Sequence, residues 1–154
     1  MSDPRTAVPA LRIHSPRDDR ALADWRRVHN TVIPHHPLSL ADARDRSVRH
    51  HLEVAYLGED LVGCTTVRPP ADDSRTATVI ARVLPGHRRK GFGAELYRRG
   101  LARARALGAE IIETVVLAEN EEGLRFALQR GFVETERYVL VPGDTVEWVD
   151  LRLA

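Results

Sequence analysis

The stretch that decides the fold is Val83–Ala94, VLPGHRRKGFGA. It predicts the end of an apolar strand at Pro85 and the start of a helix near Gly93, with a basic turn between them. The first amides of a helix have no partner within the helix, and the helix dipole adds partial positive charge there. Gly91 and Gly93 leave no Cβ to keep an anion away from these amides. The pattern predicts a pyrophosphate site.

Two better-known phosphate loops do not fit this stretch. The nucleotide-triphosphatase loop requires Gly-x-x-x-x-Gly-Lys-Ser/Thr, and the sequence has no such string. The dinucleotide fingerprint requires a third glycine, but Gly91-Phe92-Gly93 continues with Glu95 and Leu96. A lone Gly-x-Gly is also typical of an ordinary turn. Here the glycines follow Arg88 by three and five residues, behind a strand end, which is a more specific pattern.

Outward from the turn, apolar periodicity and turn residues predict an alternation of strands and helices. We expect strands at residues 10–14, 51–57, 61–68, 75–84, 110–117, 132–141 and 145–153. We expect helices at residues 16–32, 40–49 and 93–107, and a short one between Asn120 and Gly131. Ser15, Ser39 and Asn120 are the predicted helix caps. With no repeat or linker, the chain is predicted to be one mixed α/β (α+β) domain over residues 10–154, after a flexible leader at residues 1–9.

Composition narrows the class of protein. Apolar residues make up 43% of the 154-residue chain and charged residues 29%, which is typical of a soluble globular domain. No apolar run is long enough for a bilayer span, and the N-terminus lacks a signal-peptide core, so neither membrane association nor secretion is expected. Cys64 is the only cysteine and cannot form an internal disulfide, which favours a cytoplasmic location.

Basic residues are concentrated in one segment of the chain, although the formal net charge is only +1. Between Arg88 and Arg105 there are seven basic residues, opposed only by Glu95. This segment either attracts a polyanion or is simply a solvated helix face. Nucleic acid is not expected as a partner, because only Phe92 and Tyr97 offer rings on which bases stack.

Two motifs together resemble one family. The turn Arg88–Gly93 resembles the Arg/Gln-x-x-Gly-x-Gly/Ala motif of the Gcn5-related N-acetyltransferase (GNAT) family. Asn120–Phe132 resembles its second motif, which has an asparagine, then a small residue three positions later, a Phe at six, and Gly-Phe at eleven and twelve. The matching residues are Gly123, Phe126, Gly131 and Phe132. The resemblance covers roughly residues 10–153 and is weakest before His51.

The resemblance implies a fold and a cosubstrate. The fold is a single GNAT domain, with a mixed central sheet of six to seven strands splayed between the fourth and fifth, and about four helices. The cosubstrate is acetyl-coenzyme A (acetyl-CoA), with no metal. Backbone near Val83 would pair with the pantetheine arm, and Asn120 would bond the arm as well as cap its helix. The other residues implied to hold the cosubstrate are Arg88, Arg89, Lys90, Gly91, Phe92, Gly93, Ala94 and Phe126.

The implied reaction is acetyl transfer to a primary amine of a small molecule or peptide, by direct attack in a ternary complex. Many family members protonate the leaving thiolate with a tyrosine directly after the second-motif Phe, and that position is Ala127 here. Tyr138 is the candidate replacement, although it is also compatible with a core or surface role. Glu113 is the candidate base on the strand expected to line the cleft, or has a structural role. Ala77 stands where histone-modifying members carry glutamate, which disfavours histone-type substrates.

The acceptor end is expected at the connection between the first two helices. His35 and His36 lie there between prolines and are candidate substrate-binding residues or plain loop histidines. A metal site is not expected, because no cysteine or carboxylate partners have suitable spacing. The missing tyrosine leaves a second hypothesis open, a non-catalytic acyl-CoA-binding sensor or partner module. A homodimer through the apolar last hairpin is a further possibility.

Overall fold

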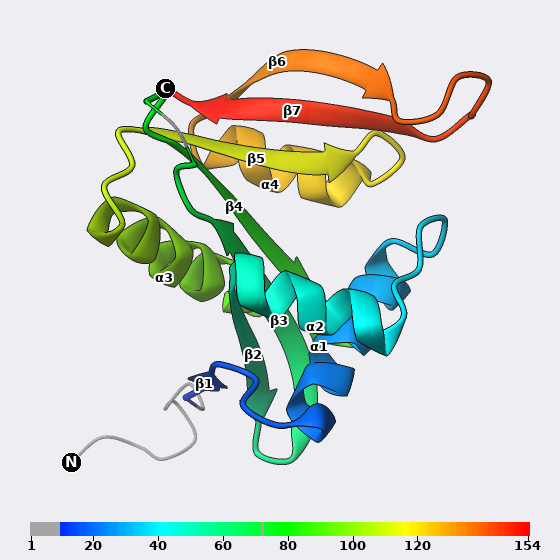
Figure 1. Cartoon of the computed structure of the whole chain (residues 1–154), viewed down its shortest axis with the longest axis vertical. Helices are drawn as coiled ribbons and strands as arrows, with labels where there is room; N and C mark the ends of the chain where they lie inside the picture. Colours follow the sequence, from blue (N-terminus) through cyan, green and yellow to red (C-terminus); the bar gives the residue numbers. More distant parts are fainter. Residues whose placement is uncertain (1–9, 72) are drawn as a thin grey trace.

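The computed structural model describes residues 10–71 and 73–154, so the predicted leader lies outside the described residues. Within these ranges, seven strands form one sheet and four α-helices cover it (Figure 1). The strands are β1 (Arg12–His14), β2 (His51–Leu57), β3 (Asp60–Arg68), β4 (Thr76–Val83), β5 (Ile111–Leu117), β6 (Phe132–Val139) and β7 (Glu147–Leu153). The helices are α1 (Asp19–Val32), α2 (Leu40–Arg49), α3 (Phe92–Ala106) and α4 (Glu121–Gln129), with a short 3-10 helix η1 (Pro85–His87) before α3.

The sheet has the order β1-β2-β3-β4-β5-β7-β6 and is antiparallel except for the parallel pair β4–β5. That pair is short: its register runs only from Thr76 opposite Ile111 to Thr78 opposite Glu113. Beyond Thr78 the two strands diverge, so the sheet opens between its halves (Figure 1). The predicted mixed sheet, splayed between the fourth and fifth strands, is confirmed.

The two faces of the sheet have separate cores. On one face, Trp25 of α1 and Ala43 of α2 pack with Val54 and Cys64, and all four side chains are fully buried. On the other face, α3 and α4 pack against β4 and β5 in a second apolar cluster that contains Tyr97. Both faces of the central strands are therefore covered, which explains why their sequences read as nearly continuous apolar runs.

The helix starts follow local capping chemistry. Ser39 begins α2 as predicted, in a capping box whose side-chain and backbone bonds are both made with Asp42. The predicted cap Ser15 is wrong. Helix α1 begins only at Asp19, because Asp18 Oδ1 accepts a hydrogen bond from the Ala21 amide at 2.8 Å and fixes the first turn there.

Close packing fixes α3 on the sheet. A Cβ added to Gly100 would lie 2.5 Å from Cγ1 of Val79, so only glycine lets the helix approach β4 this closely. Near the start of the helix, a Cβ built at Gly93 would lie 3.8 Å from Cγ2 of Val83, so the N-terminus of α3 lies beside the end of β4. No helix among residues 10–71 and 73–154 is long and apolar enough to cross a membrane.

Candidate functional site

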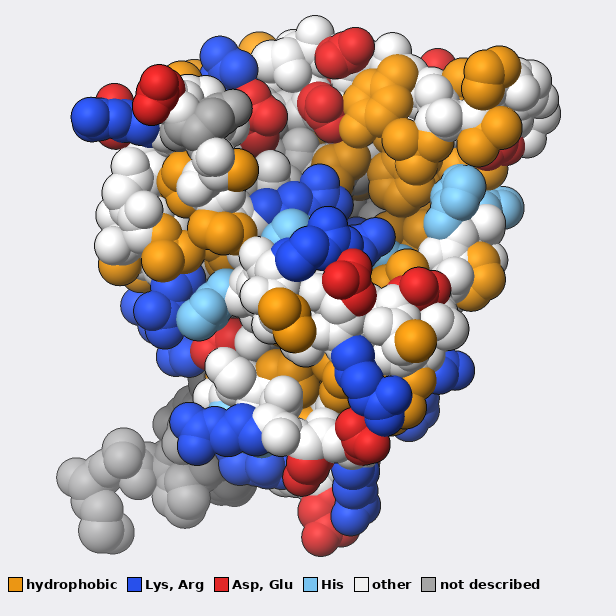
Figure 2. Space-filling model, viewed as in Figure 1, with side chains coloured by type: hydrophobic (Ala, Val, Ile, Leu, Met, Phe, Trp, Pro, Cys, Tyr) orange, Lys and Arg blue, Asp and Glu red, His pale blue; other side chains and the backbone are white. Residues whose placement is uncertain are grey.

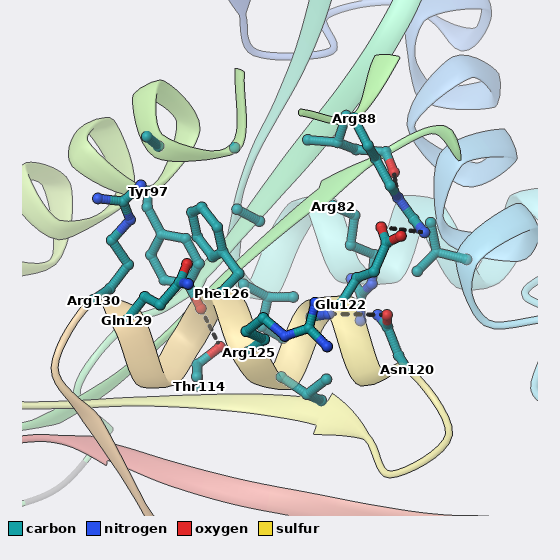
Figure 3. A pocket seen from close by; sticks show the side chains of 18 of the residues that line it. Arg82, Arg88, Tyr97, Thr114, Asn120, Glu122, Arg125, Phe126, Gln129 and Arg130 are labelled. Atoms are coloured by element: carbon teal, nitrogen blue, oxygen red, sulfur yellow. Dashed lines mark hydrogen bonds and ion pairs between the residues drawn. The ribbon is translucent and has the colours of Figure 1, made fainter. Parts of the chain in front are cut away.

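A cavity of about 380 Å³ opens where β4 and β5 diverge. Helices α3 and α4 form its walls on one face of the sheet (Figure 3). From the other face, Val32 at the end of α1 and the next residue, Ile33, reach the cavity. The remaining lining residues discussed below are Arg82, Val83, Arg88, Arg89, Gly91, Gly93, Ala94, Tyr97, Thr114, Asn120, Glu122 and Phe126. The cavity therefore connects the two faces of the sheet through the split.

The N-terminus of α3 has unpaired amides beside this cavity, which is lined there by Gly91, Gly93 and Ala94. Gly91 has φ of 83°, a left-handed conformation that favours glycine, and it provides no side-chain cap. The first bond of the helix is from the Glu95 amide to the Gly91 carbonyl at 3.2 Å. Among the described residues, the amides of Phe92, Gly93 and Ala94 have no hydrogen-bond partner. This is the arrangement in which a helix start binds an anion.

Gly93 is not required by the packing of the protein itself. A Cβ at this position would lie 3.5 Å from two ring atoms of Phe126, an ordinary contact distance, and its φ is not positive. The absence of a side chain at Gly93 therefore leaves room for a ligand in the cavity. Lys90 and Phe92, predicted with the same turn, do not line the cavity, and the buried Phe92 ring lies 6.5 Å from that of His87.

Two arginines of the turn share one carboxylate. Arg88 Nε donates to the Val83 carbonyl at 3.0 Å, and its Nη1 lies 3.7 Å from Glu122 (Figure 3). Arg89 Nη2 lies 3.5 Å from the same carboxyl group. Two cations against one anion leave the cavity mouth positive, which favours a polyanionic ligand. The Val83 carbonyl is engaged by Arg88 in this arrangement.

Asn120 and Phe126 approach the cavity from α4. Asn120 Oδ1 caps the helix by accepting a hydrogen bond from the Gly123 amide at 3.0 Å. Its Nδ2 has no partner within the part of the chain that the structure describes, so it can still donate to a ligand. The Phe126 ring stacks on Tyr97 at a centroid distance of 5.4 Å and forms an apolar wall. The cap and a binding role for Asn120 are thus compatible.

The sequence model of the acetyltransferase (GNAT) family matches residues 16–132, most of the chain. The chain belongs to this family. None of the curated protein sequences matches it.

Solved structures show the same GNAT fold. A candidate phosphinothricin N-acetyltransferase superposes with a TM-score of 0.76 at 19% identity, over 93% of this chain and 97% of that chain. YncA of Salmonella typhimurium, solved with its cofactor acetyl-CoA, superposes with a TM-score of 0.73 at 19% identity, over 94% and 93%. An acetyltransferase of Bacillus subtilis in complex with CoA gives 0.70 at 21% identity, over 94% and 98%. Similarity at this level of identity shows the shared fold.

Glu113 does not line the GNAT cavity, contrary to the prediction. It stands at the last position where β5 still pairs with β4, before the split opens, and its Oε1 accepts from Arg152 Nη2 at 2.7 Å. The next residue, Thr114, lines the cavity instead. Glu113 is therefore placed as one partner of a cross-strand ion pair between β5 and β7.

Tyr138 also lies outside the cavity lining. Its hydroxyl donates to Asp150 Oδ1 at 2.8 Å, across the β6–β7 pair. Burial, the hydrogen bond and the charge of Asp150 raise the pKa of Tyr138 above its usual value. Since the proton is already shared with a carboxylate and is held more tightly, this tyrosine is poorly placed to protonate a thiolate in the cavity.

The two predicted acceptor histidines form bridges between loops. His35 Nε2 lies 2.7 Å from Glu119, which precedes α4, and His36 packs on Trp148 at 5.8 Å and lies 3.7 Å from Asp144. Neither histidine lines the cavity. They tie the connection after α1 to the loops at the open end of the split, and Val32 and Ile33 of this segment reach the cavity in their place.

Several polar cavity residues were not predicted as functional. Tyr97 and Thr114 are buried and bonded to each other through their hydroxyls at 2.8 Å, and burial raises the pKa of Tyr97 to about 12. Arg82 was also missed, although a charged residue inside the apolar run TATVIARV is a readable signal. Among residues 10–71 and 73–154, no group of three or more His, Cys, Asp or Glu is placed to hold a metal.

Proposed function

We propose that the chain transfers an acetyl group from acetyl-CoA to a primary amine of a small molecule or peptide, by direct attack in a ternary complex. The observation that carries this proposal is the continuity of the cavity. It joins the unpaired amides at the start of α3 to the α1 side of the sheet through the β4–β5 split. A ligand bound on one face can thus meet an acceptor that enters from the other.

The chain's own groups divide the binding of acetyl-CoA between them. The amides of Phe92, Gly93 and Ala94 would hold the pyrophosphate, assisted by Arg88 and Arg89 at the mouth. The pantetheine arm would lie between the diverging strands, whose backbone groups beyond Thr78 have no partner in each other. Acetyl-CoA supplies the activated thioester carbonyl.

Proton movement sets the chemical requirements. A lysine-like amine is mostly protonated at pH 7, and deprotonating it costs about 4–5 kcal/mol. The cavity carboxylate, Glu122, already faces the guanidinium groups of Arg88 and Arg89. Of the three tyrosines in the chain, Tyr97 alone lines the cavity. Its hydroxyl donates to the neutral hydroxyl of Thr114 in this structure, a weaker acceptor than the carboxylate that holds Tyr138. We propose that the Tyr97 hydroxyl turns from Thr114 to the leaving thiolate and stabilises it by a hydrogen bond, in the role that Ala127 cannot fill.

One observation favours a second candidate, a non-catalytic acyl-CoA-binding module. Ala127 is 1% exposed and packs in the apolar cluster under α4, so it brings no acid to the cavity. If Tyr97 does not assist the leaving group, cosubstrate binding without turnover is the expected behaviour.

The homodimer remains a prediction. It rests on Val139, Leu140, Val146 and Trp148 of the last hairpin, of which Val139 and Leu140 are exposed and Trp148 is buried.

A thiol-release assay separates these candidates. The purified chain is incubated with acetyl-CoA and a panel of amines, and free CoA is followed with a thiol reagent. The buried Cys64, whose pKa is raised to about 12 by burial, should contribute no background. We expect at least one amine to release CoA above the acceptor-free rate, and Tyr97→Phe to slow that release.

Two other outcomes would contradict the proposal in different ways. If acetyl-CoA raises the melting temperature but no amine is acetylated, the binding module is favoured. If acetyl-CoA does not raise the melting temperature and no amine is acetylated, the cavity is not an acetyl-CoA site.

A further inference from the structure

Arg82 is a buried cation without a counter-ion. Its side chain is 8% exposed, and among the described residues it forms no hydrogen bond or ion pair. Burial, together with the nearby charges of Arg68 and Arg46, lowers the pKa of Arg82 to about 10, so it still carries its charge at neutral pH. Burying an unpaired charge is strongly unfavourable unless something compensates it. A ligand that brings a negative charge would provide that compensation.

Strand alternation places Arg82 on the face opposite α3. Val79 and Val83 face α3, because Cβ atoms built at Gly100 and Gly93 lie 2.5 and 3.8 Å from their side chains. Successive side chains of a strand point to opposite faces, and Arg82 is an odd number of residues from both valines. Its side chain therefore points to the α1–α2 face. Its cross-strand partner Cys64 packs in the core under α1. Arg82 thus lies across the sheet from the amides proposed to bind pyrophosphate, while lining the same cavity.

Further unpaired cations surround Arg82 on this face. Arg68 lies on β3 with the same side-chain direction as Cys64, and its buried Nε has no partner. Arg46 of α2 has no ion pair among the described residues, and with Arg68 it lines a second hollow that also contains His50. Figure 2 shows Lys and Arg side chains gathered in the middle of this face, next to a hollow. Three mutually repelling guanidinium groups are therefore held close together.

Neutral polar atoms in the same region are also unsatisfied. Thr66 Oγ1 and His29 Nδ1 are buried without partners, and both belong to elements packed around Arg82. Burial, followed by the charge of Arg82, lowers the pKa of His29 to about 3, so its ring is neutral at pH 7 and adds no further positive charge. The charge of Asp150 acts on Arg68, but this carboxylate already accepts the Tyr138 hydroxyl and is not paired with Arg68. Among residues 10–71 and 73–154, no carboxylate pairs with these guanidinium groups, and Thr66 adds a free hydroxyl donor for an anion.

We propose that Arg82, with Arg68 and Arg46, binds a carboxylate group of the acceptor, so that the acceptor is an amino acid or a similar small amine that carries a carboxylate. This inference rests on the proposed function. Arg82 directly precedes Val83 at the β4 end of the split, so a carboxylate held there leaves its amine facing the cavity. Planar guanidinium groups bind carboxylates through paired hydrogen bonds. CoA itself is a poor candidate for this anion, since its pyrophosphate is assigned to the opposite face.

Matched ligand pairs test the proposal without requiring turnover. The CoA-loaded protein is titrated calorimetrically with free amino acids and with the amines that lack only the carboxylate, such as phenylalanine with phenethylamine and lysine with cadaverine. At least one amino acid should bind tenfold or more tightly than its decarboxylated partner. Arg82→Gln and, more weakly, Arg46→Gln should remove that difference while leaving CoA affinity unchanged. Arg44→Gln, on the outer face of α2 and paired with Asp19, should preserve the difference.

The possible outcomes separate this inference from the proposed function. If the amines bind as well as the amino acids, if no pair member binds, or if amines that carry a phosphate bind instead, the carboxylate assignment is wrong. If the carboxylate preference depends on Arg82 but no acetyl transfer occurs, the anion site is supported and the enzymatic function fails. Arg46 is half-buried on a helix surface, so Arg46→Gln keeps the test valid if Arg82→Gln does not fold.

Discussion

Replacing Gly93 with alanine should raise the stability of the chain but weaken its binding of the cosubstrate. Gly93 is the second residue of α3, its φ is not positive, and an added Cβ meets Phe126 at 3.5 Å and Val83 at 3.8 Å, both ordinary contact distances. Alanine is better than glycine within a helix by about 0.5–1 kcal/mol. For a domain of this size, that corresponds to a rise in melting temperature of roughly 1–4 °C.

The same methyl group should weaken acetyl-CoA binding. Gly93 lines the cavity, and its Cβ would occupy the approach to the unpaired amides. A hydrogen bond to a charged group contributes about 1.5–3 kcal/mol, and each 1.4 kcal/mol is about tenfold in affinity. Loss of one amide–phosphate contact should therefore raise the Kd for acetyl-CoA about 10- to 100-fold.

Calorimetric titration and thermal unfolding of the same preparations measure both effects. Gly86→Ala is the matched control, since it lies in the same turn, has open space around its Cβ and does not line the cavity. Its Kd should equal that of the unmodified chain. A Gly93→Ala protein that is as stable as expected but binds acetyl-CoA with unchanged affinity would refute the placement of the pyrophosphate.

Three more substitutions probe the site and its surroundings. Asn120→Asp should keep the α4 cap and the free energy of unfolding within about 0.5 kcal/mol, yet weaken acetyl-CoA binding by removing the free Nδ2 donor; unchanged affinity by calorimetry would exclude that contact. Arg82→Met should raise the free energy of unfolding in urea by about 1 kcal/mol or more, because it removes an unpaired buried charge; a large loss would mean that Arg82 is structurally paired. The pKa of His29 is about 3, below its ordinary value of 6.5, so the unfolded chain takes up the proton first and stability falls as the pH drops through 6.5. That loss should reach about 2 kcal/mol between pH 7 and pH 5, and urea titrations of His29→Gln should show a loss smaller by this amount.

The fold was predictable because local signals agreed with the tertiary arrangement. Ser39 and Asp42 form the predicted capping box, and the glycine-containing turn before α3 stands between a strand and a helix as predicted. The start of α1 was not predictable in the same way. Ser15 and Asp18 are both good caps in isolation, and only the bond actually made to the Ala21 amide selects Asp18.

The cavity was predicted better than its reactive groups. The turn and second-motif residues Gly91, Gly93, Asn120 and Phe126 do line one cavity. Glu113 was assigned to the cleft from its strand alone, but the position where β4 and β5 part is set by tertiary structure, and Glu113 lies just before it. Spacing along the chain does not show which residue stands beyond that point.

For Arg82, the sequence signals an unusual residue but not its role. The sequence contains the anomaly, a cation inside an apolar strand, but does not show whether a carboxylate faces it. Only the packing of α1, α2 and β3 around Arg82 shows that the described chain provides no counter-charge. Buried charges and their partners come from distant segments, so this information is carried by the fold.

The pyrophosphate site is tested most directly by a titration of the ¹⁵N-labelled chain with CoA, followed through its backbone amide resonances. If the start of α3 binds the pyrophosphate, the largest shifts belong to Phe92, Gly93 and Ala94 and saturate together with those of the Arg88 and Arg89 amides. Most α2 amides should remain unperturbed. Saturable binding that leaves the amides at the start of α3 unshifted would show that the diphosphate is held elsewhere.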